Sequence, residues 1–428
     1  MKKTQRTSLL VIAALAFAGV VGPAAAQKTT ITWLVSSSPA DLPAAKGIVA
    51  DFQAANPGIK VDLETRPSGS EGDNIIKTRL ATKTMADVFT YNSGSLFRAL
   101  NPGRNLVDLT GEPWMAGIND YFKQAVGFNG RVYGAPYGTS MAGGIFYNRK
   151  IYEKLGLKVP KTWGEFMANN DKIKKAGLIP VIQTYADPWT SQVLVLSDFY
   201  NLQAQVPTFA ADYTAGKAKY AKTPAALSGF EKLQKVREAG YVNPDFASAK
   251  FADGLRMLAE GKGAHYPMLT TAINALKNNQ SAQLGDIGFF AQPGDDAANN
   301  GLTVWMPVGM YIAASSSNIP AAKRLVAFIA SAKGCESRDR VVGATGPYLV
   351  KECTLPKDVP PVVADLLPYF DKGGKMALAL EFVSPIKGPA LQQFTVEVGS
   401  GIRPAAEGAA LYDEDVRKQA QQLGLPGW

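Results

Sequence analysis

The sequence has a single histidine, His265, and only two cysteines, Cys335 and Cys353, among its 428 residues. A zinc site of the usual kind draws on several histidine and cysteine ligands, so this composition excludes one. The G-x-x-x-x-G-K-[S/T] loop that cradles nucleotide phosphates is also missing. We therefore expect neither a metal nor a cofactor.

Long runs of basic residues are absent as well. Lysine and arginine outnumber aspartate and glutamate, giving a net charge of +9, but they are dispersed along the chain. Proteins that follow a nucleic-acid backbone gather basic residues into a patch or an arm. The sequence therefore argues against a nucleic-acid partner, and the excess charge is interpreted as a solvated surface.

The one long apolar run lies near the start of the chain and is too short to span a membrane. It extends from Leu9 to Val21, whereas a spanning helix needs about 20 apolar residues. Lys2 and Lys3 precede it and Ala24-Ala25-Ala26 follows it, the pattern of a signal peptide at 1–26. We predict cleavage after Ala26, no lipid anchor because no cysteine lies near that point, and a mature protein in the periplasm.

The two cysteines form an even set in a chain that carries an export signal. Oxidising compartments favour disulfides, so a bond between Cys335 and Cys353 is predicted. Two unpaired thiols are the alternative, because pairing cannot be deduced from sequence alone.

Strand and helix patterns alternate after the export signal. β-rich runs at 31–35, 59–63 and 87–91 are separated by segments with helical spacing of apolar residues, which predicts an α/β fold with a mainly parallel sheet. In such sheets the ligand crevice lies beyond the carboxyl ends of the strands. The segments 36–38 and 91–93 are therefore expected near a ligand.

Two local signals mark a helix start and a possible hinge. Thr162 and Glu165 have the spacing of a capping box, which predicts a helix beginning there. The segment 131–148 combines glycines, a proline and aromatic strand residues, which favours a strand passing between domains. A surface hairpin is the alternative.

Several motifs carry a family resemblance when they are taken in order. They are Asn56–Val61, Ala86–Phe89, Tyr133–Pro136, Tyr147–Lys150 and Pro160–Phe166, followed by 251–264, 287–289 and 321–329. With them the chain resembles family 1 extracellular solute-binding proteins of ABC importers, the group that includes the maltose-binding protein. It departs from the pattern at Met268-Leu269-Thr270-Thr271, where many members have a tryptophan. His265, in the preceding strand, is interpreted as a packed strand residue.

The resemblance implies a periplasmic binding protein fold, in which two discontinuous α/β lobes are joined by crossing hinge segments. The expected spans are 27–137 and 290–337 for the first lobe, and 138–289 and 338–428 for the second.

The resemblance also implies a function. The protein is expected to be a monomeric receptor, not an enzyme, that binds a di- or oligosaccharide between its lobes and delivers it to the permease subunits of an ABC importer in the inner membrane. Another small solute in the same fold is one alternative. An exported carbohydrate-active enzyme is the other, although the sequence shows no recognisable pair of catalytic carboxylates.

Polar and aromatic residues near strand ends and crossings are the candidate ligand contacts. A sugar offers apolar C–H faces and hydroxyl groups, which aromatic planes and donor–acceptor side chains match. The resemblance places an acidic-Pro-aromatic ligand segment at Asp187-Pro188-Trp189. The other candidates are Ser37, Ser38, Tyr91, Asn92, Ser93, Tyr137, Thr139, Thr270, Trp305 and Tyr348. For each of them, local packing or a turn is the alternative interpretation.

Overall fold

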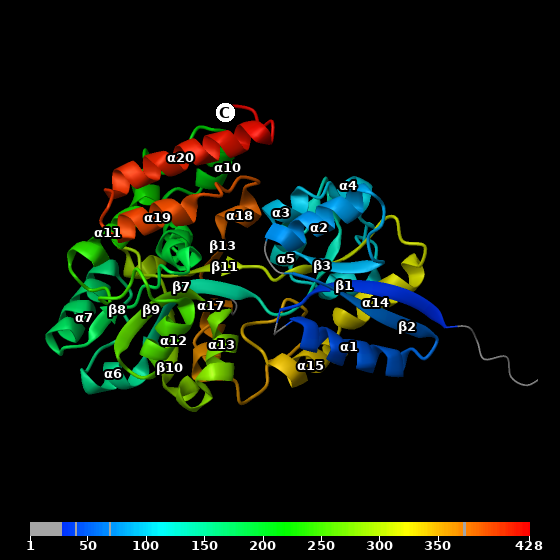
Figure 1. Cartoon of the computed structure of the whole chain (residues 1–428), viewed down its shortest axis with the longest axis horizontal. Helices are drawn as coiled ribbons and strands as arrows, with labels where there is room; N and C mark the ends of the chain where they lie inside the picture. Colours follow the sequence, from blue (N-terminus) through cyan, green and yellow to red (C-terminus); the bar gives the residue numbers. More distant parts are fainter. Residues whose placement is uncertain (1–27, 39–40, 68–69, 371–373) are drawn as a thin grey trace, which may run out of the picture.

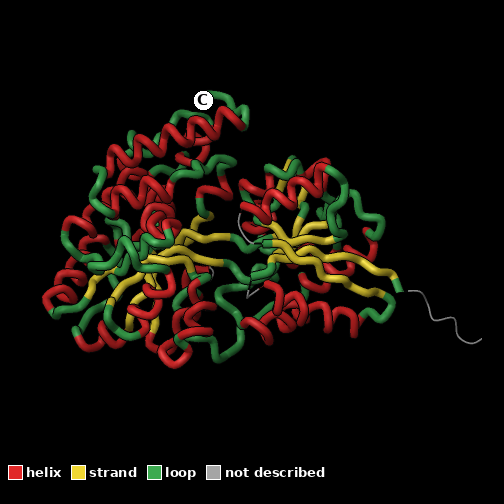
Figure 2. Tube along the Cα trace, viewed as in Figure 1, coloured by secondary structure: helices red, strands yellow, loops and turns green. Residues whose placement is uncertain are grey.

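The computed structural model describes residues 28–428, except 39–40, 68–69 and 371–373 (Figure 1). The predicted signal peptide and its cleavage site lie outside the described residues. Two lobes lie side by side along the longest axis, each built on its own β-sheet (Figure 2). Within the described ranges, no helix is both long enough and apolar enough to cross a membrane.

The first lobe is built on a five-stranded sheet in the order β2-β1-β3-β12-β6. Its strands are β1 (Thr29–Ser36), β2 (Ile59–Arg66), β3 (Val88–Tyr91), β6 (Gly134–Pro136) and β12 (Gly309–Ile312). β1 pairs in parallel with β2 and β3, as the alternating pattern predicts, whereas β12 runs antiparallel to β3 and β6. Alternate residues of β1, such as Ile31 and Trp33, are fully buried beneath its helices.

The helices of the first lobe cover both faces of this sheet (Figure 1). They are α1 (Asp41–Ala55), α2 (Ser70–Ala81), α3 (Ser95–Arg98), α4 (Pro102–Asn105), η1 (Pro113–Gly117), α5 (Asp120–Ala125), α14 (Ile319–Ile329) and α15 (Ala332–Val342), with the small hairpin β4 (Gly127–Phe128) and β5 (Arg131–Val132). α1 buries Ile48, Val49 and Phe52 at helical spacing, so its apolar stripe faces the core.

The second lobe is built on a six-stranded sheet in the order β13-β11-β7-β9-β8, with β10 also paired to β7. Its strands are β7 (Met141–Asn148), β8 (Ile179–Val181), β9 (Gly263–Leu269), β10 (Ile287–Ala291), β11 (Leu302–Trp305) and β13 (Met376–Leu378). β7 is antiparallel to β9, β10 and β11, while β8 and β9 are parallel. His265 of β9 is fully buried, which confirms it as a packed strand residue.

Helices of the second lobe surround this sheet and extend to the C-terminus. They are α6 (Arg149–Lys154), α7 (Trp163–Lys175), η2 (Pro188–Gln192), α8 (Val193–Leu196), α9 (Phe199–Gln205), α10 (Phe209–Thr214), α11 (Pro224–Glu238), α12 (Phe251–Ala259), α13 (Ala272–Asn279), η3 (Ser281–Asp286), η4 (Ala297–Asn299), α16 (Pro361–Ala364), α17 (Leu367–Phe370), α18 (Leu380–Val383), α19 (Leu391–Gly399) and α20 (Ala405–Gln422). The predicted capping box is confirmed: Thr162 and Glu165 each bond the other's backbone N–H at the start of α7.

The chain passes between the two sheets three times. The first crossing is the segment between β6 and β7, at 137–140. The second lies at 306–308 rather than near 290, because β10 and β11 both pair with β7 and so stay in the second lobe. The third follows Cys353 rather than residue 337, because a disulfide to Cys335 in α15 holds this stretch against the first lobe. The disulfide itself was predicted and is confirmed.

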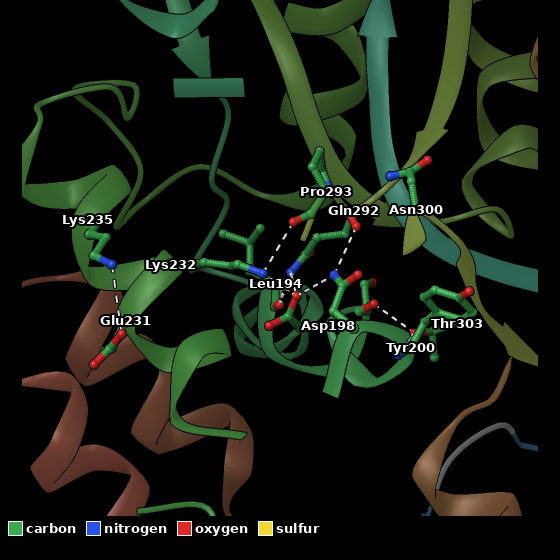
Figure 3. A network of polar contacts seen from close by, with 12 residues as sticks. Leu194, Asp198, Tyr200, Glu231, Lys232, Lys235, Gln292, Pro293, Asn300 and Thr303 are labelled. Carbon is green, nitrogen blue, oxygen red and sulfur yellow. Dashed lines mark hydrogen bonds and ion pairs between the residues drawn. The ribbon is translucent and has the colours of Figure 1, made fainter. Parts of the chain in front are cut away.

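A buried polar network fixes part of the second lobe (Figure 3). Lys232 of α11 donates to Asp198, at the start of α9, and to the carbonyl of Pro293. Gln292 and Asn201 donate to the same carboxylate of Asp198. The network therefore ties two helices to the turn that follows β10, and all three donor side chains share the buried carboxylate of Asp198.

Candidate functional site

A cleft of about 550 Å³ opens where the two lobes meet, within the 300–1,000 Å³ range that is usual for small-molecule sites. We call it the interlobe cleft. It is lined by Ser38, Asp41, Tyr137, Gly138, Thr139, Met141, Thr271, Asn274, Ala275, Asn278, Asn279, Pro307, Val308, Arg338 and Thr345. Because the lining comes from both lobes and from the first two crossings, movement of one lobe against the other must change its shape.

The strand directions bring polar residues to this junction. β1 and β3 are parallel and run toward the second lobe (Figure 1), and β9 is antiparallel to β7, which begins at the first crossing. The carboxyl ends of all three strands therefore point at the gap between the sheets. In α/β sheets this edge is where ligands bind. The cleft therefore lies at the edge that the alternation of strands and helices predicted.

The first-lobe wall of the interlobe cleft is held by hydrogen bonds around Asp41. The backbone N–H of Asp41 donates to Ser38 Oγ at 3.0 Å, and Ser38 Oγ donates to Asp41 Oδ2 at 2.9 Å. Tyr137 Oη donates to the carbonyl of Asp41 at 3.1 Å. These bonds fix the start of α1 against the first crossing, with the Asp41 carboxylate at the cleft.

Arg338 brings a positive charge to the same wall. Its guanidinium carbon lies 5.9 Å from the centre of the Tyr137 ring, and Gly138 packs beside it with a φ of 116°. Its Nε and Nη1 are buried and have no partner among the described residues. Burial raises the pKa of Tyr137, and the nearby Arg338 lowers it by a smaller amount, so this phenol is neutral at ordinary pH.

Hydrogen bonds join the first crossing to the segment 345–348, which precedes the third crossing. Thr139 Oγ1 lies 3.0 Å from Thr345 Oγ1, and Ser140 Oγ donates to the carbonyl of Pro347 at 2.9 Å. Thr139 and Tyr348 also form an isolated β-bridge. The hinge therefore consists of adjoining segments that are distant in sequence.

Several candidates from the sequence do not line the interlobe cleft. Tyr91 is fully buried at the end of β3, and Ser93 is also buried, where its hydroxyl donates to the carbonyl of Pro307. Thr270 is buried and accepts from the backbone of Ala142. Asn92 uses its carbonyl to bind Tyr311, and Ser37 is exposed next to the cleft residue Ser38.

The remaining candidates make contacts outside the cleft lining, and of these only Trp305 is buried, while Asp187, Trp189 and Tyr348 are half-buried. Asp187 accepts from the backbone N–H of Phe251, the first residue of α12, and the ring of Trp189 lies 5.3 Å from that of Phe251. Trp305 is 6% exposed. The hydroxyl of Tyr348 is buried without a partner among the described residues. Of the twelve proposed contacts, Ser38, Tyr137 and Thr139 are those that line the cleft.

Sequence reasoning missed three groups of lining residues. Asp41 follows the polar turn after β1, and its position at the start of a helix was a usable signal. Asn274 and Asn278 of α13 are four residues apart, a spacing that places them on one helix face. Arg338 had no local signal, because α15 reaches the cleft only through its packing against the rest of the first lobe.

A second contact joins the lobes outside the cleft lining. The ring of Phe382 in α18 packs on Gly94, which has a φ of 74°. A Cβ placed on Gly94 would lie 2.7 Å from Phe382 Cδ1 and 2.8 Å from the carbonyl oxygen of Glu381. This close approach requires a glycine at 94.

Candidate metal ligands are not gathered at the cleft or elsewhere in the described ranges, where no group of three or more His, Cys, Asp or Glu side chains could hold an ion. The cleft offers hydroxyls, side-chain amides, one carboxylate and one guanidinium. These groups suit a polar ligand rich in hydrogen-bonding atoms.

The sequence and the fold are similar to those of known solute-binding proteins. Residues 36–334 match the family model described as bacterial extracellular solute-binding protein. The chain is 26% identical over 337 residues to the multiple sugar-binding protein of Streptococcus mutans, covering 76% of this chain and 77% of that protein. It is 22% identical over 377 residues to the melibiose/raffinose/stachyose-binding protein MelE of Bacillus subtilis, covering 81% of each. The solved apo form of RafE from Streptococcus pneumoniae superimposes with a TM-score of 0.77 at 21% identity, covering 94% of this chain and 99% of that one, a likeness of fold.

Proposed function

The chain belongs to the bacterial extracellular solute-binding proteins, and we propose that it is the receptor component of an ABC-type carbohydrate importer. In this proposal it binds a di- or oligosaccharide between its lobes and delivers it to permease subunits in the inner membrane. It acts as a monomer in the periplasm after cleavage behind Ala26, without a lipid anchor.

The observation that carries the proposal is the lining of the interlobe cleft by both lobes. Asp41 and Arg338 come from the first lobe, Asn274 and Asn278 come from the second, and Thr139 lies on a crossing. A ligand that touches both walls makes more contacts when the lobes are closed, so it shifts the population toward the closed state. A permease that recognises this state can distinguish loaded from empty receptor.

The chemistry of the lining supports a sugar as the ligand. Hydroxyls and side-chain amides donate and accept at once, as sugar hydroxyls do. Relatives are named for sugars, among them melibiose, raffinose and stachyose. We propose that Ser38, Asp41, Thr139 and Arg338 contact the ligand from the first lobe and the hinge.

A binding role is favoured over glycoside hydrolysis by the carboxylates of the cleft. Glycosidases place two carboxyl groups about 5–10 Å apart across the scissile bond. Asp41 is the only carboxylate among the lining residues, and Ser38 already donates to it. We therefore assign no catalytic residue.

A thermal-shift screen of the mature protein tests the proposal. The panel holds raffinose, melibiose, stachyose, galactose and maltose, with spermidine, arginine and glycine betaine as other solutes. A ligand at 100 times its Kd adds about 2.7 kcal/mol to the free energy of unfolding, so a specific sugar raises the melting temperature. A shift in melting temperature with a non-sugar solute alone would support the receptor role and refute the claim that the ligand is a sugar. Release of shorter saccharides during incubation would refute the receptor role.

A further inference from the structure

α13 turns a polar face to the interlobe cleft and an apolar face to the core. Ala272, Ile273 and Leu276 are buried. Thr271, Asn274, Ala275 and Asn278 line the cleft, and their spacing of three, four and seven residues is that of one helix face. Burial of the apolar stripe therefore sets the orientation of the helix. The amides lie on the opposite face and so point toward the cleft.

The amides on this face are free to bind a ligand. Within the described ranges, the side chains of Asn274, Asn278 and Asn279 make no hydrogen bond, although each carries two donors and an acceptor. By contrast, Thr139 pairs with Thr345, and Ser38 pairs with Asp41. The uncommitted hydrogen-bonding capacity of the second-lobe wall thus lies on α13.

The lining of the cleft does not offer an open aromatic plane. Tyr137 is its only aromatic residue. Tyr137 is 2% exposed, and its ring has Trp33 edge-on at 5.7 Å and the Arg338 guanidinium carbon at 5.9 Å. A sugar in this part of the cleft therefore cannot be held by stacking of its C–H face, and recognition must come from its hydroxyl edge.

We propose that the polar face of α13 determines ligand specificity, with Asn274 and Asn278 binding neighbouring hydroxyls of a saccharide unit held edge-on between α13 and the wall formed by Asp41 and Arg338. This inference rests on the proposed function and names the mode of recognition in the same site. An amide that donates to one hydroxyl and accepts from the next selects their relative orientation. In the closed complex the ligand covers these amides, so removal or methylation of either hydroxyl leaves a covered amide unpaired, which is costly.

Isothermal titration of four variants tests the inference. Asn274→Leu and Asn278→Leu keep the approximate size of the side chain and remove both donors and acceptor, whereas Asn278→Asp removes the donors, keeps acceptor oxygens and adds a negative charge. Gln205→Leu is the matched control, because Gln205 is an exposed helix amide of the second lobe outside the cleft lining. The ligand is whichever of raffinose, melibiose, stachyose, galactose or maltose binds the unaltered protein most tightly. Circular dichroism and unliganded melting temperatures check that each variant folds.

Each cleft variant is expected to bind about tenfold more weakly or worse, since a lost hydrogen bond that leaves a buried partner unpaired has an effect of this order. Gln205→Leu is expected to bind as the unaltered protein does. Unchanged affinity in folded Asn274→Leu and Asn278→Leu, with a saccharide still bound, would overturn the role of α13 and leave the receptor function standing. If no saccharide binds the unaltered protein, both the inference and the sugar-binding function fall.

Discussion

Lys232 Nζ lies 2.5 Å from Asp198 Oδ1 in the interior of the second lobe, and the two side chains are 4% and 5% exposed. A buried charge without its partner is strongly unfavourable, whereas a satisfied pair is tolerated. Gln292 also donates to this carboxylate (Figure 3). Asn201 supplies a further hydrogen bond to it. The pair therefore matters for stability mainly because removal of one partner leaves the other charge buried and unpaired.

Asp198→Asn is expected to lower the free energy of unfolding by about 3–5 kcal/mol, because the Lys232 ammonium remains buried without a counter-charge. Urea denaturation followed by circular dichroism measures the change. Lys235→Met on the same helix is the control: its 3.8 Å pair with Glu231 is largely exposed, so a change of about 0–1 kcal/mol is expected. Equal effects of the two substitutions would contradict the prediction.

The disulfide supports both stability and the cleft. Cys335 and Cys353 close a loop with a sequence separation of 18, and this loop carries the cleft residues Arg338 and Thr345. Replacing both cysteines by serine should lower the free energy of unfolding by about 3 kcal/mol and weaken ligand binding. Denaturation with and without a reducing agent measures the change in the free energy of unfolding. The agent should destabilise the unaltered protein and leave the double variant unaffected.

His265 should make the protein less stable in acid. Burial lowers its pKa to about 3, and its ring lies between Tyr152 Oη at 2.6 Å and Asn170 Oδ1 at 2.8 Å. The unfolded chain takes up a proton near pH 6.5 and the folded chain does not. The stabilising contribution of the neutral ring is therefore complete above about pH 6.5 and falls by up to about 1.4 kcal/mol per pH unit as the pH drops toward 3.

Comparison with His265→Gln isolates this contribution, because other groups titrate in the same window. Asp339, whose pKa burial raises to about 6, acts in the opposite direction: the folded chain binds its proton first, so stability rises as the pH falls from 6. The difference in free energy of unfolding between the two proteins, measured from pH 7 to 4, should shrink in acid. A constant difference would rule out a buried neutral ring.

Gly94→Ala should open the two lobes. The added Cβ meets the Phe382 ring at 2.7 Å, and the positive φ at 94 disfavours any side chain. We expect a larger radius of gyration by small-angle X-ray scattering. The binding free energy of the ligand should become less favourable by about 1–3 kcal/mol. Gly156→Ala is the control, since its φ of 63° is similar but nothing lies within 4 Å. It should lose about 1–2 kcal/mol of stability without a change in dimensions.

The features that sequence reasoning predicted depend on local patterns. The alternation in 31–35 and 59–63 fixes a parallel ladder between β1 and β2, and the spacing of Thr162 and Glu165 fixes a helix start. The family motifs supplied the two-lobed architecture, which the two separate sheets bear out.

The features that it missed depend on contacts between distant residues. The second crossing was placed too early, because only pairing with β7 shows that β11 belongs to the second lobe. Trp305 and Thr270 are residue types that suit a sugar site, one aromatic and one with a hydroxyl. Both are buried, however, by neighbours that are distant in the sequence. Arg338 reaches the cleft only because α15 is positioned within the first lobe, so no pattern around it indicated a ligand contact.

The position of β12 in the first sheet limits when the newly made chain can fold. β12 begins at Gly309, yet it lies between β3 and β6, so β6 has no partner in that sheet until β12 has been synthesised. The second sheet is likewise incomplete until β13 appears near residue 376. Most of the polypeptide must therefore leave the ribosome before the sheet of either lobe can be completed. A chain that folds this late is still unfolded, and therefore narrow enough to pass through a secretion pore.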